Sequence, residues 1–327
     1  MEPKSKIYIA GHTGMMGSAF LRQLQARGQA NIVTRTHREL DLTNQAAVNA
    51  FFEKEKPEYV LVAAAKVGGI MANATYPADF IYLNLAMQTN IIHAAYLSGV
   101  KRLLFLGSVC IYPKHCPQPI KEDYLLTGAL EPTNEPYAIA KIAGMKMCEA
   151  YNRQYGTQYL CAMPTNLYGT GDNFDLETSH VLPALIRKFH ESKMHGTSVT
   201  LWGTGQASRE FLHVDDCANA CIFLMDLNPE RFQTLLDYPA GPLVNIGSGE
   251  DISILDLAGM IQKLIGASGQ INWDSSKPDG TPKRKLDITR LDALGWQPRI
   301  SLSNGIQMTY DWYLQHDKSP KLMEAPS

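Results

Sequence analysis

Short apolar runs alternate with longer amphipathic stretches through the first half of the chain. The apolar runs predict buried strands, and the stretches with helical spacing between them predict helices. Strand–helix alternation of this kind implies a parallel sheet covered on both faces, wound by right-handed crossovers. The expected strands are 7–10, 32–33, 59–63, 103–106 and 159–162, and the expected helices are 15–28, 45–55, 77–97 and 136–155.

After about residue 165 the pattern loosens into shorter apolar runs separated by Gly and Pro turns. We therefore expect an α/β fold: a doubly wound parallel Rossmann sheet followed by a smaller C-terminal α/β substrate-binding domain. The first domain should cover residues 1–165, with room for later segments to return to it. Residues 166–316 should form mainly the second domain, and 317–327 a loose polar tail.

Composition narrows the choice of partners. The chain has 30 basic and 32 acidic residues, a net charge of −2, so we expect no nucleic acid and no membrane surface as partner. It contains no apolar run of about 18 residues, and its N-terminus resembles no signal peptide, which predicts a cytoplasmic protein. The six cysteines lack paired C-x-x-C spacing, so we expect no metal site.

A glycine motif links the first expected strand to the first expected helix. Glycines let the backbone turn tightly and approach a pyrophosphate, while the helix N-terminus offers free N–H groups. Glycines also close ordinary turns, but the strand–motif–helix context favours a dinucleotide site. The motif reads Gly11-His12-Thr13-Gly14-Met15-Met16-Gly17.

The end of the second expected strand is basic. An NAD site usually carries a carboxylate there, whereas Arg35, His37 and Arg38 suit the 2′-phosphate of NADP(H). A solvated basic loop is the alternative interpretation. Asp41 fits either a contact to the adenine edge or a cap for the helix that begins near Gln45.

Tyr137 and Lys141 form a Y-x-x-x-K motif on an expected helix, where i,i+4 spacing places both side chains on one face. The lysine's charge would lower the pKa of the phenol, which could then exchange a proton with a substrate oxygen. Ser108, at the end of the fourth expected strand, could donate to the same oxygen.

Two further residues stay open on spacing alone. Cys110 lies two positions past Ser108, so on an extended strand end it would share that face, as either a core cysteine or an acid/base thiol. His180 precedes an apolar helix, and it is either a surface histidine or a group that reaches the pocket.

Together these residues resemble the extended short-chain dehydrogenase/reductases that act on nucleotide sugars. The likeness runs from about Ile7 to Tyr313 and includes loops expected on the substrate side. It rests on Ala65–Ile70, Cys110–Pro113, Glu131–Tyr137, Pro164–Gly169, Asp172–Phe174, Arg209–Asp216 and Ser276–Thr281.

The resemblance implies a bifunctional reaction on GDP-4-keto-6-deoxy-D-mannose: epimerisation at C3 and C5, then NADPH-dependent reduction of the C4 ketone. It implies that Cys110 is the base and His180 the acid of the epimerisation. Tyr137 would then protonate the C4 oxygen, Lys141 would support Tyr137 and hold the nicotinamide ribose, and Ser108 would stabilise the enolate.

The resemblance also implies binding residues and a homodimer that pairs through 77–97 and 136–155. Substrate contacts would come from Lys188, Trp202, Arg209, Asp279 and Lys283. Besides the glycine motif, cofactor contacts would come from Arg35, His37, Arg38, Asp41, Leu42, Lys141, Pro164, Thr165, Asn166, Leu167 and His180.

The chain departs from the family pattern at three positions, and two rival functions must be weighed. Thr13 and His37 stand where bacterial members have arginine, and Val109 where serine is expected. An NAD-dependent 4,6-dehydratase or 4-epimerase is one rival, but a dehydratase needs a carboxylate pair beside the serine. The other is a non-catalytic NADP(H)-binding sensor, which would not need Tyr137 and Lys141.

Overall fold

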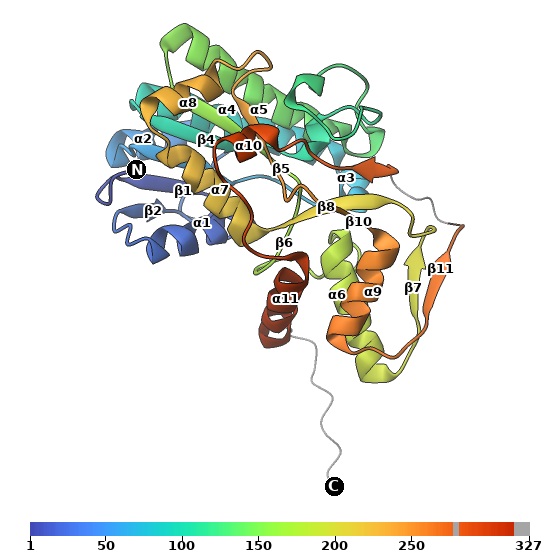
Figure 1. The fold of residues 1–327 in the computed structure, drawn as a ribbon. Helices are drawn as coiled ribbons and strands as arrows, with labels where there is room; N and C mark the ends of the chain where they lie inside the picture. Colours follow the sequence, from blue (N-terminus) through green and yellow to red (C-terminus); the bar gives the residue numbers. More distant parts are fainter. Residues whose placement is uncertain (277–280, 317–327) are drawn as a thin grey trace.

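The computed structural model describes residues 1–276 and 281–316 and contains a six-stranded parallel sheet (Figure 1). The strands follow the order β2-β1-β3-β4-β5-β9, so the winding direction reverses between β1 and β3. The strands are β1 (Ile7–Ala10), β2 (Ile32–Thr34), β3 (Tyr59–Val62), β4 (Arg102–Leu106), β5 (Tyr159–Pro164) and β9 (Leu243–Ile246).

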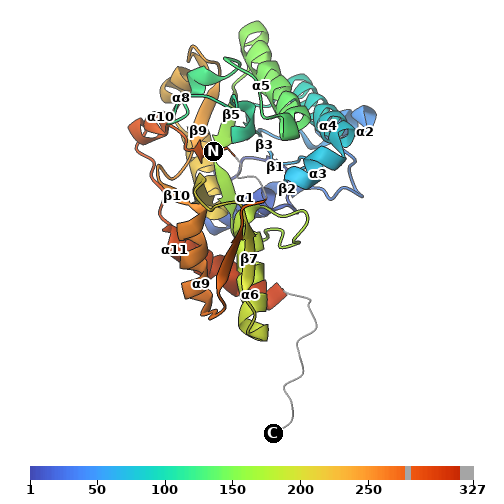
Figure 2. The same ribbon diagram turned by 90° about the vertical axis from the view of Figure 1, so that its right-hand side faces the viewer.

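Helices cover both faces of this sheet, and each face has its own apolar core (Figures 1 and 2). One core joins the sheet to α2, α4 and α5, and the other joins it to α1 and α7. This confirms the predicted doubly wound fold. The helices are α1 (Met15–Ala26), α2 (Gln45–Glu55), α3 (Ile70–Thr75), α4 (Pro77–Leu97), α5 (Glu135–Tyr155) and α7 (Val214–Asp226).

A second lobe lies below the sheet in Figure 1, around a third apolar core. Its helices are α6 (Val181–His195), α9 (Ile254–Ile265) and α11 (Leu302–His316). Strand β7 (Val199–Trp202) pairs with β11 (Ile271–Asp274). A small sheet between the lobes contains β6 (Asn166–Tyr168), β8 (Ser208–His213), β10 (Asp251–Ser253) and β12 (Lys283–Arg284).

The chain crosses between the lobes more than once. Helix α7 and strand β9 pack in the first lobe although both follow residue 165. We propose a two-domain division near residue 165 in which these segments return to the nucleotide-binding domain. The remaining helical elements are the 3₁₀ turns η1 (Val109–Ile111), η2 (Glu122–Tyr124) and η3 (Pro132–Asn134), with α8 (Pro229–Leu236) and α10 (Thr289–Ala293).

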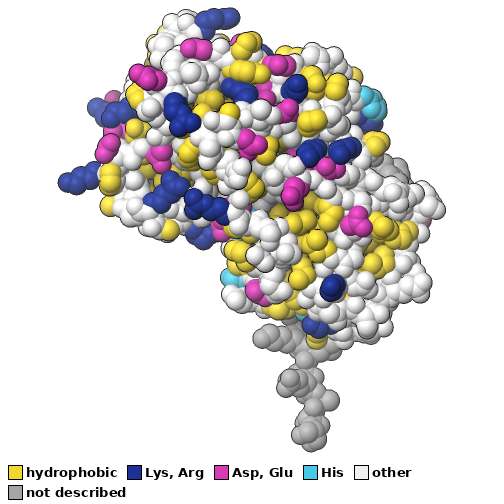
Figure 3. Space-filling view, viewed as in Figure 1, with side chains coloured by type: hydrophobic (Ala, Val, Ile, Leu, Met, Phe, Trp, Pro, Cys, Tyr) yellow, Lys and Arg dark blue, Asp and Glu magenta, His cyan; other side chains and the backbone are white. Residues whose placement is uncertain are grey.

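Two expected features, Asp279 and the loose tail 317–327, lie outside the described residues. Within the described part, no helix is long and apolar enough to cross a membrane. Side chains of both charge signs are interspersed over the face shown in Figure 3.

Candidate active site

The glycine motif lies at the point where the sheet reverses its winding. Gly11 follows β1 with φ +83°, and a Cβ there would lie 2.7 Å from the backbone Cα of Ala64, which follows β3. A Cβ on Gly17 would lie 2.0 Å from the Gly11 carbonyl oxygen. Both glycines are therefore required for the loop after β1 to fold closely against its neighbours.

The N-terminus of α1 is left open for an anion. Its N-cap, Gly14, has no side chain to cap the helix, and the first turn carries no acidic residue. Thr13 and Gly14 are exposed, whereas Met15 and Met16 are half-buried against the core. The half-buried His12 leaves its Nδ1 without a hydrogen-bond partner. A cradle with free N–H groups and no competing carboxylate fits a dinucleotide pyrophosphate.

The basic segment after β2 differs from the expectation. Arg35 is already engaged, since it forms a 2.7 Å ion pair with Glu55 and donates to the Thr34 carbonyl. His37 and Arg38 are exposed at the strand end. Arg38 is therefore the more exposed arginine of this segment, while Arg35 is already paired within the first lobe.

The suggestion that Asp41 caps the next helix is wrong. Asn44 is the N-cap of α2 and accepts from the Ala47 N–H, because it immediately precedes the helix. Asp41 instead accepts from the N–H and hydroxyl of Thr43. Leu42 packs against the core, and Asn90 donates to its carbonyl.

Three of the predicted catalytic residues come together at the carboxyl ends of β4 and β5. Tyr137 and Lys141 share one face of α5, and the Lys141 Nζ lies 5.9 Å from the centre of the Tyr137 ring. Ser108, directly after β4, forms a hydrogen bond with Tyr137. Lys141 donates to the carbonyl of Leu106 at 2.8 Å, which fixes the ammonium under the sheet edge.

The electrostatics of this cluster are dominated by desolvation. Burial raises the pKa of Tyr137, nearby Cys110 raises it further, and the hydrogen bond with Ser108 opposes both. Burial also lowers the pKa of Lys141 to about 8. Lys141 is not among the groups that shift the pKa of Tyr137, so the expected lowering of the phenol pKa by the lysine is not met here.

Cys110 belongs to the same cluster, but by a different geometry from the one expected. Strand β4 ends at Leu106, and Cys110 lies in the 3₁₀ turn η1 rather than on an extended strand. Its N–H donates to the Ser108 hydroxyl at 3.3 Å, which ties the turn to the serine. The dehydratase rival loses its main requirement, because no residue of η1 is a carboxylate.

Asn134 is a member of the site that the motifs did not single out. Its side-chain Nδ2 donates to the sulfur of Cys110 at 3.2 Å. The residue precedes α5 at the N-cap position, where its type would ordinarily indicate helix capping. An asparagine at this position is normally interpreted as a helix cap, so the sequence alone did not indicate a contact with the sulfur.

His180 is the N-cap of α6. Burial around its ring lowers the pKa of the imidazole, although the residue as a whole keeps exposed surface. The loop before it is tied to Gly69, whose N–H donates to the Thr178 carbonyl. Gly69 begins α3, which packs against η3 and so brings this loop towards Asn134.

The expected nicotinamide-side residues follow β5. Thr165 donates its N–H to Ile246, and both Thr165 and Asn166 donate side-chain hydrogen bonds to the carbonyl of Glu210. Pro164 is buried within the sheet, and Leu167 packs against the α1–α7 core. These contacts hold the segment at the edge where the lobes meet.

The residues expected to bind GDP lie in the second lobe and the small sheet. Arg209 on β8 and Lys283 on β12 are on adjacent strands, and Lys283 pairs with Asp251 at 2.9 Å. Lys188 on α6 donates to Thr200 on β7, and burial lowers the pKa of its ammonium. Trp202 ends β7 with 62% of its surface exposed.

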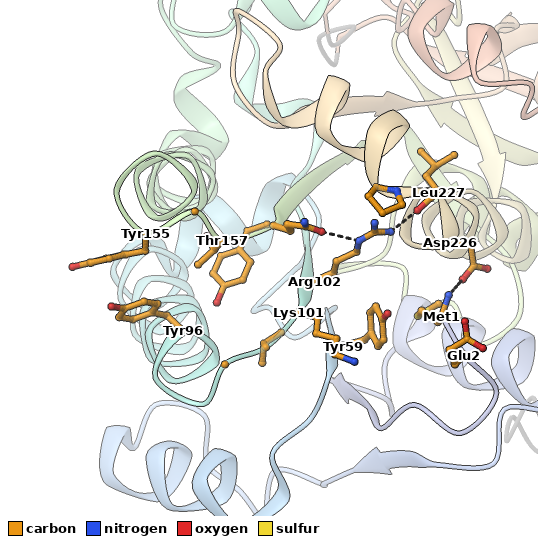
Figure 4. Close-up of a pocket in the computed structure, with 16 residues that line it drawn as sticks. Met1, Glu2, Tyr59, Tyr96, Lys101, Arg102, Tyr155, Thr157, Asp226 and Leu227 are labelled. Atoms are coloured by element: carbon orange, nitrogen blue, oxygen red, sulfur yellow. Dashed lines mark hydrogen bonds and ion pairs between the residues drawn. The ribbon is translucent and has the colours of Figure 1, made fainter.

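A separate cavity of about 720 Å³ lies at the opposite, amino-terminal edge of the sheet (Figure 4). Tyr59, Arg102 and Tyr159, which line it, begin β3, β4 and β5. Parallel α/β sheets bind ligands at the carboxyl ends of their strands, so this cavity is not the cofactor site. Among the described residues, no cluster of His, Cys, Asp or Glu could hold a metal ion.

Fold and site define a dinucleotide-dependent enzyme of the short-chain dehydrogenase type. The family model described as "NAD dependent epimerase/dehydratase family" matches residues 7–237. The chain belongs to this family and, within it, to the GDP-L-fucose synthases.

The relatives cover nearly the whole chain. GDP-L-fucose synthase 1 of Arabidopsis thaliana is 57% identical over 96% of this chain and 95% of the relative. GDP-L-fucose synthase of Escherichia coli K12 is 54% identical, covering 96% and 98%. Among solved structures, the GDP-mannoheptose C4 reductase MlghC of Campylobacter jejuni, with NADP bound, has a TM-score of 0.88 and 43% identity, covering 96% and 99%.

Proposed function

We propose that this chain converts GDP-4-dehydro-6-deoxy-D-mannose to GDP-L-fucose by epimerising C3 and C5 and then reducing C4. NADP(H) is the cofactor, as in the NADP-bound structural relative. One observation carries the proposal: the Cys110 thiol lies beside the Ser108–Tyr137 pair. A simple ketone reductase needs the pair, whereas an epimerase also needs a base at the adjacent carbons.

Epimerisation begins at the carbons that flank the ketone, because their protons are acidified by it. The Cys110 thiolate takes a proton from C3 or C5, and the charge moves to the C4 oxygen as an enolate. Ser108 and Tyr137 can stabilise that oxygen by hydrogen bonding. His180, from the facing loop, returns a proton to the opposite side of the carbon.

Reduction follows at the same oxygen. NADPH supplies the hydride for C4 when it is bound in the cradle after β1. Tyr137 gives its phenolic proton to the C4 oxygen, and desolvation of this phenol favours its protonated form. Lys141 lies close enough to Tyr137 to support proton return and to contact the nicotinamide ribose.

The two ends of the ligands are bound by different lobes. The pyrophosphate of the cofactor would meet Gly11–Gly17, Arg38 and His37 would contact its 2′-phosphate, and Asp41 and Leu42 would border the adenine. Pro164–Leu167 would border the nicotinamide. Lys188, Arg209 and Lys283 would meet the GDP phosphates and Trp202 would offer a stacking face to the guanine, while Asp279, outside the described residues, is expected to contact the ribose or base.

We also infer a homodimer paired through α4 and α5, and a cytoplasmic location. The two helices lie side by side in Figure 2 and carry large exposed apolar side chains, including Tyr82 at 67%, Ile139 at 42% and Tyr155 at 45%. Large exposed apolar side chains on two adjacent helices support an association surface there. A working thiol at Cys110 requires a reducing compartment.

Product analysis tests the proposed function. The purified protein is incubated with GDP-4-dehydro-6-deoxy-D-mannose and NADPH, and the sugar is identified by NMR. GDP-L-fucose, with C3 and C5 inverted, supports an epimerase that also reduces. A GDP-linked 6-deoxy-D-sugar with both carbons retained would show a reductase alone, and oxidation of NADPH without keto sugar consumption would contradict both.

A further inference from the structure

We infer that Asn134 is a positioning residue that stabilises the thiolate form of Cys110 and fixes the direction of its sulfur. The inference rests on the proposed role of Cys110 as the epimerisation base. It adds that a neutral side-chain amide favours the ionised form of that base and sets its orientation.

The side chain of Asn134 does not cap the helix that it precedes. It occupies the N-cap of α5, yet it makes no capping hydrogen bond to the helix. Asparagine is among the best N-cap residues because its oxygen ordinarily accepts from the first-turn N–H groups. Pro136 at the start of α5 removes one of those donors. The amide therefore serves something other than the helix.

The Asn134 amide instead contacts the sulfur of Cys110. The Nδ2 group donates to the Cys110 Sγ at 3.2 Å, while the buried Oδ1 has no hydrogen-bond partner. An N–H donor favours a negatively charged acceptor over a neutral one, so this contact favours the thiolate. Among the described residues, Asn134 is the only side chain that donates to this sulfur.

Two short turns hold the pair in register. The Asn134 N–H donates to the Glu131 carbonyl within η3, and the Cys110 N–H donates to Ser108 within η1. Turn η3 is further supported where Glu131 pairs with Lys114 at 3.0 Å. The backbones that carry the amide and the sulfur are thus each held by a hydrogen bond in their own turn.

In the part of the chain that the structure describes, the two lysines closest to this pair are engaged elsewhere. Lys141 is committed to the carbonyl of Leu106, and Lys114 to Glu131. Tyr137 and Cys110 are close enough that a negative sulfur raises the pKa of the phenol. The titratable groups near the sulfur on the elements packed against η1 and η3 include Glu135, Tyr137 and Lys141 of α5, Tyr112 at the end of η1, and the Lys114–Glu131 pair.

The test follows the thiolate directly, by the pH dependence of iodoacetamide alkylation at Cys110, read by mass spectrometry. Asn134→Ala should move the midpoint up by about one pH unit, which is about tenfold less thiolate at neutral pH. Asn134→Asp should move it further, since a carboxylate repels the thiolate. Thr133→Ala, an exposed neighbour in the same turn, should leave the midpoint unchanged.

A second readout separates positioning from collapse of the site. Oxidation of GDP-L-fucose by NADP⁺ passes a hydride to the cofactor and needs no base at C3 or C5. Asn134→Ala should keep this rate within about twofold, while its C3/C5 exchange in D₂O falls about tenfold at pH 7. Because its side chain does not cap α5, the variant loses no cap.

Either of two results would overturn the inference: an alkylation midpoint that stays at the wild-type pH, or one that falls. A fall would mean that the amide oxygen accepts from the thiol and favours the neutral form. Failure of the proposed function would look different, because Cys110→Ala would then retain C3/C5 exchange whatever the alkylation profile of Asn134→Ala.

Discussion

At the residue scale, the site is shaped by burial more than by pairs of opposite charges. Lys141 is 3% exposed and its ammonium meets a carbonyl rather than a carboxylate. Tyr137 is desolvated, and its hydrogen bond comes from Ser108. The motif spacing predicts that these residues meet, but it does not reveal that the lysine is short of a counter-charge.

A pH-dependent stability of the ligand-free protein follows from Lys141. Its folded pKa is about 8, below the ordinary value of 10.5, so between these pH values the unfolded chain binds the extra proton. Stability must therefore rise with pH across this window. We expect wild type to gain about 2–3 kcal/mol relative to Lys141→Met between pH 7 and pH 10.

Urea unfolding of both proteins at the two pH values measures this difference. The comparison with Lys141→Met cancels the titration of other groups that the two proteins share. A constant difference between wild type and variant would mean that Lys141 is charged and well solvated in the folded protein.

At the element scale, the first turn of α1 depends on backbone contact that only glycine permits. Gly17→Ala would place a Cβ 2.0 Å from the Gly11 carbonyl oxygen, and both sides of that clash are backbone. We expect at least tenfold weaker NADPH binding and lower stability, measured by fluorescence titration and thermal unfolding.

Gly259→Ala is the matched control, because Gly259 is also inside a helix, α9, but has no atom within 4 Å of an added Cβ. It should gain about 0.5–1 kcal/mol from helix propensity and bind NADPH as wild type does. Equal NADPH affinity in the two variants would refute the close packing of the cradle.

Elements with a regular period were predictable, and turns that depend on distant partners were not. The helices 77–97 and 45–55 begin and end where expected, because their apolar spacing and end signals are local. The 3₁₀ turn at Cys110 could not be foreseen, since it is held by Ser108 and by Asn134 across 24 residues. The ion pair of Arg35 could not be predicted from the sequence, because its partner, Glu55, lies on another element.

At the scale of the whole molecule, strand–helix alternation predicts the parallel sheet and the helices on its two faces. It does not predict which later segments, α7 and β9, return to the first lobe. The strand 243–246 lies in the part of the chain where the apolar pattern loosens, yet it closes the sheet beside β5. The residues proposed to meet GDP come from α6, β7, β8 and β12, which lie far apart along the chain, so no local pattern encodes their arrangement.

Association through α4 and α5 is testable at this scale. Tyr82→Glu places a charge on the exposed face of α4 and should shift a dimer towards monomer by at least tenfold in dissociation constant. Met308→Glu on α11, where the side chain is 41% exposed, is the control and should not change the mass seen by sedimentation. If Tyr82→Glu keeps the wild-type mass, the pairing face lies elsewhere.

The central claim is that one site inverts two carbons before it reduces a third. Its most direct test is exchange: GDP-4-dehydro-6-deoxy-D-mannose is incubated with the protein in D₂O without NADPH, and deuterium is located by NMR. Wild type should place deuterium at C3 and C5, and Cys110→Ala should reduce that incorporation at least a hundredfold. Exchange that persists unchanged in Cys110→Ala would contradict the account.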